Sequence, residues 1–208
     1  MLGPFVGVGA VGQMSVAIGL AEWLWYVPYI LGSVLFAAAA ADPGRAVGKI
    51  CRASRAVVAL VGPVALLLML VGRRLVPFIY GRAYEPAGLL FVTLIPGMTA
   101  IAVHIVVDSY FAGRGFPPVS VWSAFGALAA KVGLNLIVIP TYGAVGAATV
   151  TVGVYVALLT VKLVVFSRTT STPLVLILKP TWADVRGNIG VATVWLRERL
   201  RLAAARAG

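Results

Sequence analysis

The sequence predicts an all-α membrane protein, and three of its properties indicate that class. Hydrophobic residues make up 61% of the 208 residues and charged residues only 11%, whereas a soluble domain is about half apolar and about a quarter charged. The mean hydropathy is +1.02. The apolar residues fall in runs of about 20, the length that crosses a bilayer as a helix. This composition all but excludes a soluble globular enzyme, and it excludes an intrinsically disordered chain.

Residues 1–167 are expected to form a bundle of about five transmembrane helices. The predicted spans are residues 9–38, 56–71, 87–111, 119–139 and 143–166. Three spans contain central helix-breaking residues, namely Pro28, Gly62-Pro63 and Pro96-Gly97. Such residues form packing kinks in membrane helices, but broken helices also form transporter binding sites. Pro140, Tyr142 and Gly143 predict a tight turn between the last two spans.

The basic residues predict the orientation in the membrane. Twelve belong to one side: Arg45, Lys49, Arg52, Arg55, Arg114, Arg168, Lys179, Arg186, Arg197, Arg199, Arg201 and Arg206. Three belong to the other side: Arg73, Arg74 and Arg82. The positive-inside rule places the larger group in the cytoplasm, so the N-terminus is expected outside the inner (cytoplasmic) membrane and the C-terminus inside. The net charge of +11 then indicates contact with anionic lipid rather than nucleic acid. An outside start with an odd number of spans indicates the later part of a longer protein.

The tail, residues 168–208, differs in composition from the spans. A short apolar patch at 174–178 precedes Thr181 and Asp184, which have capping-box spacing. Apolar residues then recur at helical intervals: Val185, Ile189, Leu196 and Leu200. The pattern predicts a basic amphipathic helix on the cytoplasmic leaflet, and the alternative is a frayed polar tail.

Four groups of motifs carry a resemblance to a known superfamily. They are Val11–Ala17 with Leu20–Trp25 and Pro28; Phe78–Tyr84; Leu94–Gly97 with Ala112–Gly115 and Pro117; and Leu134–Pro140 with Tyr142-Gly143 and Gly146–Ala148. In this order they make residues 11–166 similar to the multidrug/oligosaccharidyl-lipid/polysaccharide exporter superfamily. The similarity is to the polysaccharide (O-antigen-type) flippase branch. Glu22 matches an acid of the lipid II branch, but Trp23 stands where that branch has an arginine.

The resemblance implies a two-lobe transporter that moves a polyprenyl-linked sugar across the membrane by alternating access around a central cavity. This chain resembles most of the C-terminal lobe only, so we expect an N-terminal lobe or partner membrane chain beside it, in addition to membrane lipids. Such transport needs no cofactor, because it needs only two states of a cavity and a driving gradient. The alternative is a non-transporting membrane scaffold or a subunit of a polysaccharide export assembly.

Charged residues within apolar spans are the strongest candidates for the substrate path, because burying one in the membrane costs about 2.5–3.5 kcal/mol. Glu22 and Lys131 are both expected near mid-membrane and facing the cavity; the alternative is a structural ion pair. Asn135 lies one turn beyond Lys131. Trp23 and Trp25 could stack on sugar rings, although packing against a neighbouring helix is the more frequent role of such residues.

Two further titratable residues predict a different site. His104 and Asp108 are spaced i, i+4 on one face of the third span. This spacing suggests a proton or cation relay, and the alternative is an aspartate that orients a buried histidine. Lys162 is near the cytoplasmic end of the last span, from where its ammonium can extend to the interface. We find no catalytic or metal-ligating motif, so we expect neither enzyme activity nor a metal site; a membrane-bound sugar transferase is a weaker alternative.

Overall fold

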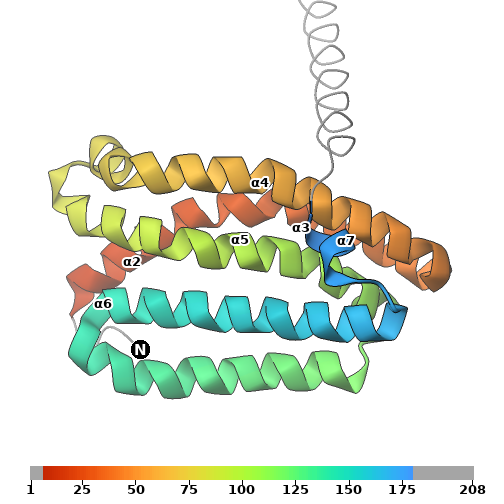
Figure 1. The fold of residues 1–208 in the computed structure, drawn as a ribbon. Helices are drawn as coiled ribbons and strands as arrows, with labels where there is room; N and C mark the ends of the chain where they lie inside the picture. The colour runs from red at the N-terminus through yellow and green to blue at the C-terminus, as the bar shows by residue number, and fades with distance from the viewer. Residues whose placement is uncertain (1–6, 180–208) are drawn as a thin grey trace, which may run out of the picture.

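The computed structural model describes residues 7–179, in which every regular element is a helix. The helices lie side by side in one bundle (Figure 1). Their bounds are α2 (Val8–Ala21), α3 (Trp23–Ala41), α4 (Pro43–Tyr80), the short 3₁₀ helix η1 (Arg82–Tyr84), α5 (Glu85–Gly113), α6 (Pro118–Thr170) and α7 (Leu174–Leu178). Four stretches, which contain α3, α4, α5 and α6, are long and apolar enough to cross a membrane. The all-α membrane class is therefore confirmed. The amphipathic helix expected in the tail falls on residues 180–208, outside the described part.

Helix α5 is the centre of the bundle, because α2, α3, α4 and α6 all pack against it. Two glycines allow neighbouring backbones to approach it closely. A Cβ on Gly97 would lie 2.9 Å from the Cα of Val152 in α6, and one on Gly113 would lie 2.7 Å from the Cβ of Ala39 in α3. Small residues at helix contacts are typical of membrane bundles, where close backbone packing replaces the hydrophobic driving force.

The first predicted span, 9–38, consists of two helices that meet at Glu22. The N–H of Trp25 donates to the Glu22 carbonyl at 3.1 Å, a tight 3₁₀-type bond that interrupts the α-helical pattern. Pro28 lies inside α3 and cannot donate to the carbonyl one turn before it. The chain therefore changes local geometry at the acidic residue that the sequence singled out.

Helix α4 is much longer than the predicted span 56–71. Its 38 residues extend about 57 Å at 1.5 Å per residue, compared with a hydrocarbon core of about 30 Å. The Asp42 carboxylate accepts a hydrogen bond from the Arg45 N–H at 3.1 Å and caps the helix start. The basic segment between the first two predicted spans is thus the first part of α4, whose buried residues Ile50, Ser54, Val57 and Val61 recur at helical intervals.

Helix α6 contains 53 residues but reverses direction at Gly143, so that its two halves, 118–142 and 144–170, run antiparallel (Figure 1). Gly143 has φ 56° and ψ −141°, a left-handed conformation that favours glycine. A Cβ on Gly146 would lie 2.6 Å from Val138 Cγ1, so the start of the second half packs closely on the end of the first. The two halves account for the last two predicted spans.

Successive connections lie at opposite ends of the bundle (Figure 1). At one end, here called the α3–α4 end, α3 and α5 terminate, α4 begins, and α6 both begins and terminates. At the other, the α4–α5 end, α4 passes through η1 into α5. Helix α7 folds back onto α4 at the α3–α4 end, where the Leu176 carbonyl accepts a hydrogen bond from Arg55 Nη1 at 2.7 Å. The four residues of the larger basic group that α4 contains therefore lie at the α3–α4 end, namely Arg45, Lys49, Arg52 and Arg55.

Candidate functional site: a cavity between α2, α5 and α6

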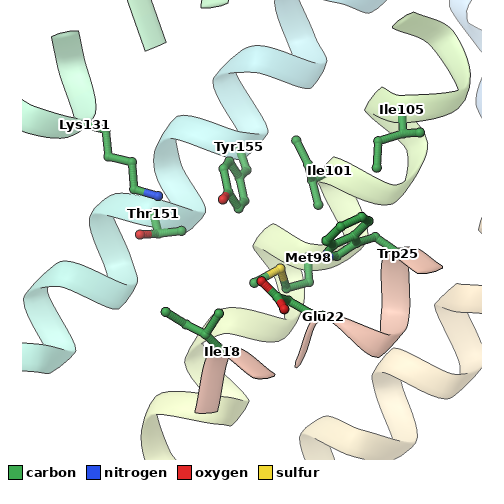
Figure 2. A pocket seen from close by; sticks show the side chains of 9 residues that line it. All are labelled: Ile18, Glu22, Trp25, Met98, Ile101, Ile105, Lys131, Thr151 and Tyr155. Atoms are coloured by element: carbon green, nitrogen blue, oxygen red, sulfur yellow. The ribbon is translucent and has the colours of Figure 1, made fainter. Parts of the chain in front are cut away.

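A cavity of about 200 Å³ lies among the α2–α3 junction, α5 and both halves of α6. Its apolar wall consists of Ile18, Met98, Ile101 and Ile105, and its polar and aromatic wall consists of Glu22, Trp25, Lys131, Thr151 and Tyr155. Figure 2 shows the side chains of these residues converging on one space. The volume suits a group the size of one sugar ring rather than a whole lipid, since full ligand pockets usually measure about 300–1,000 Å³.

Glu22 and Lys131 are brought to this cavity from helix positions 109 residues apart in the sequence. Each lies near the middle of its helical path: Glu22 at the junction of α2 and α3, and Lys131 midway along the first half of α6. Within the described residues no ion pair joins the two side chains. The Lys131 Nζ instead lies 5.1 Å from the centroid of the Tyr155 ring, a cation–π contact. The structural ion pair that the sequence left open is therefore not formed.

The cavity thus contains a hydrogen-bond acceptor and a cationic donor, and neither is paired with a counter-charge from residues 7–179. An ion within a membrane span is costly and is retained where it faces a cavity, a partner or a ligand. Trp25 and Tyr155 add aromatic faces. Such a set of groups can bind a ligand that is polar, carries both donors and acceptors, and has an apolar ring face.

Two other predicted substrate-path residues do not line the cavity. Trp23 is 71% exposed on the outer surface, with its ring 5.4 Å from that of Tyr26. Asn135 is buried at 8% exposure, and its Oδ1 has no hydrogen-bond partner in the part of the chain that the structure describes. Of the two tryptophans, only Trp25 can contact a ligand in this cavity.

Asp108 belongs to a separate polar cluster near the α3–α4 end. Its carboxylate forms an ion pair with Lys162 at 2.5 Å, and Lys162 also donates to Ser120 Oγ at 2.7 Å. The Lys162 Nζ lies 5.1 Å from the centroid of the Phe111 ring. The expectation that Lys162 reaches the interface is wrong, because the residue is only 2% exposed. Asp108, 54 residues away in the sequence, supplies a counter-charge inside the bundle that no local pattern reveals.

His104 does not share this cluster's hydrogen bonds. Its Nε2 is buried without a hydrogen-bond partner among residues 7–179, and no hydrogen bond joins it to Asp108 there. The relay predicted for these two residues therefore has no direct link between its members. The described residues also contain no group of three or more histidine, cysteine or acidic side chains able to hold a metal ion.

Comparison with known proteins adds no relative: no family model, curated protein or solved structure matches this chain. The superfamily resemblance carried by the four motif groups therefore remains a prediction.

Proposed function

We propose that this chain is one lobe of a transporter that moves a lipid-linked oligosaccharide or polysaccharide precursor across the cytoplasmic membrane by alternating access. The observation that carries the proposal is the cavity between α2, α5 and α6, where Glu22 and Lys131 face one space without pairing. A sugar presents hydroxyl donors and acceptors together with an apolar ring face, and the carboxylate, the ammonium and two aromatic rings complement these groups.

The unequal burial of α6 supports the lobe part of this proposal. In its first half, residues 118–142, only Ser120, Asn135 and Ile139 are buried. Large apolar side chains of this half are exposed, among them Trp122 at 73% and Phe125 at 62%. In a membrane, lipid or a second protein lobe must cover such a face. This face of the first half of α6 is therefore available to a second lobe.

A vesicle assay tests the proposal. The full chain is reconstituted in liposomes containing a fluorescent polyprenyl-diphosphate disaccharide, and transbilayer exchange is followed as loss of signal to an impermeant quencher. We expect the chain to accelerate exchange over protein-free vesicles. Lys131→Met and Glu22→Gln should each slow exchange about tenfold, which corresponds to about 1.4 kcal/mol of lost interaction in the rate-limiting state.

The matched control is Lys49→Met, a substitution of the same type on the exposed face of α4, remote from the cavity. It should leave exchange unchanged. Vesicles in which the native chain gives no more exchange than protein-free vesicles contradict transport by this chain in the absence of a partner lobe. Acceleration that persists in both cavity variants contradicts the assignment of the substrate path to Glu22 and Lys131.

A further inference from the structure

The α4–α5 end of the bundle carries a concentration of positive charge around one hollow. Arg73 and Arg74 near the end of α4 and Arg82 in η1 line an open hollow of about 820 Å³, together with Pro77, Phe78, Gly81 and Glu85. These three arginines are the whole of the smaller group of basic residues counted from the sequence. All three therefore line the same hollow, although the positive-inside rule requires no basic residues on the side of the membrane opposite the cytoplasm.

The three guanidinium groups are not neutralised by any carboxylate in the part of the chain that the structure describes. Across residues 7–179, no ion pair or hydrogen bond of their side chains is formed, and Glu85 lies in the same hollow without pairing to any of them. At the α3–α4 end, by contrast, Arg45 pairs with Asp42 and Arg55 donates to the Leu176 carbonyl. The hollow therefore has a net charge of +2 from four ionised side chains, with fifteen guanidinium N–H donors available.

The backbone fixes the shape of this hollow. Gly81 has φ 91°, a conformation that favours glycine, and its N–H donates to the Pro77 carbonyl at 2.9 Å. This turn directs Arg82 back toward the end of α4. On the other side, a Cβ on Gly88 would lie 2.7 Å from the Arg73 carbonyl oxygen, so α4 and α5 are in close backbone contact beside the arginines. The arginines therefore extend from a fixed turn and a tight helix pair.

We propose that this hollow binds the phosphate group of a membrane lipid. The planar guanidinium forms paired hydrogen bonds with phosphate oxygens, and three of them exceed what one exposed carboxylate can neutralise. Phe78 lines the same hollow and is 88% exposed, which provides an apolar surface beside the charge. A ligand with a phosphate joined to an apolar chain satisfies both features. The residues differ from those of the transport cavity, so this inference does not rest on the proposed function.

Calorimetric titration of the full chain in neutral detergent micelles with inorganic pyrophosphate tests the inference. We expect saturable binding that weakens with added salt, since exposed charges are screened. The triple variant Arg73→Gln, Arg74→Gln, Arg82→Gln should bind at least about tenfold more weakly, because it removes every charge-assisted donor of the hollow. The matched control is Lys49→Gln, Arg52→Gln, Arg168→Gln, which removes the same charge from exposed positions outside the hollow and should bind as the native chain does.

Two results of the titration overturn the inference. No binding of pyrophosphate by the native chain excludes the site, and an equal loss of affinity in both triple variants shows attraction to net charge alone. A second arm identifies the lipid by competition, with short-chain phosphatidylglycerol and a polyprenyl diphosphate as displacing probes and phosphatidylcholine as reference. Displacement by phosphatidylglycerol indicates a phospholipid site, and selective displacement by the polyprenyl diphosphate indicates a site for the sugar carrier. Failure of both to displace pyrophosphate contradicts a lipid ligand. Transport in the vesicle assay is a separate outcome, so the two proposals can fail independently.

Discussion

The two lysines inside α6 both follow apolar stretches of sequence, but their environments are opposite. Lys162, in the second half, is 2% exposed and contacts Asp108, Ser120 and the Phe111 ring. Lys131, in the first half, lines a cavity and contacts only the Tyr155 ring among the interactions of the described chain. The fold has given one lysine a counter-charge and left the other available to a ligand.

This difference shows that a charge within an apolar helix does not by itself identify a binding site. Burial of an ion is tolerated when an opposite charge and further hydrogen bonds compensate for lost hydration. Lys162 meets that condition by joining α5 to both halves of α6. Lys131 does not, which makes it a candidate for substrate contact. Stability measurements on the two positions can test the distinction directly.

The largest expected effect is that of Lys162→Met. Removing the ammonium leaves the Asp108 carboxylate without its counter-charge. Breaking one partner of a fully buried pair costs about 3–5 kcal/mol, which is an upper limit here because the Asp108 side chain is 29% exposed. The free energy of unfolding, measured by denaturant titration in detergent micelles, should fall by up to that amount. The double variant Asp108→Asn, Lys162→Met should recover a large part of the loss, because no uncompensated charge remains. If Lys162→Met were as stable as the native chain, the ion pair between Lys162 and Asp108 would not stabilise the bundle.

Much of the fold follows from the sequence, because the length and hydropathy of a membrane helix are set by the bilayer. The reversal at Gly143 is also visible, since Pro140, Tyr142 and Gly143 combine a helix breaker with a residue that tolerates positive φ. The full length of α4 could not be predicted from the sequence. Its basic first part is helical because Ile50, Ser54 and Val57 are buried at one face, and polar residues on the opposite face hide that pattern from a hydropathy count.

The candidate site was only partly predictable. Glu22 and Lys131 stand out as charges in apolar runs, but the Asp108–Lys162 pair joins residues 54 positions apart and needs the tertiary structure. The spacing of residues in the sequence does distinguish Trp25 from Trp23. Ile18, Glu22 and Trp25 follow i, i+4, i+7 spacing and line the cavity together, whereas Trp23 falls about 100° around the helix from Glu22.

An intermediate effect is expected for Gly97→Ala, which changes the packing that holds the cavity walls near Lys131. The new methyl group would lie 2.9 Å from the Val152 Cα, so α5 and the second half of α6 must move apart. Overpacking of this kind costs about 1–3 kcal/mol. Gly126→Ala is the control, because a Cβ there meets nothing within 4 Å and alanine favours a helix. The free energy of unfolding in detergent micelles should be lower for Gly97→Ala than for Gly126→Ala. Equal values would show that the α5–α6 contact tolerates more volume than the structure allows.

The smallest effect on stability is expected for Lys131→Met, although this substitution, like Glu22→Gln, is expected to slow transport about tenfold. The lysine forms no ion pair with the described residues, and its contact with the Tyr155 ring is worth about 0.5–1 kcal/mol when exposed. Methionine also fills the apolar cavity wall without the cost of a charge. The free energy of unfolding should therefore change by less than about 1 kcal/mol, and Tyr155→Leu should add little when combined with it, because the two residues share one contact. A loss as large as that of Lys162→Met would mean that both lysines hold the bundle together, and the cavity would then lose the cation on which the transport proposal depends.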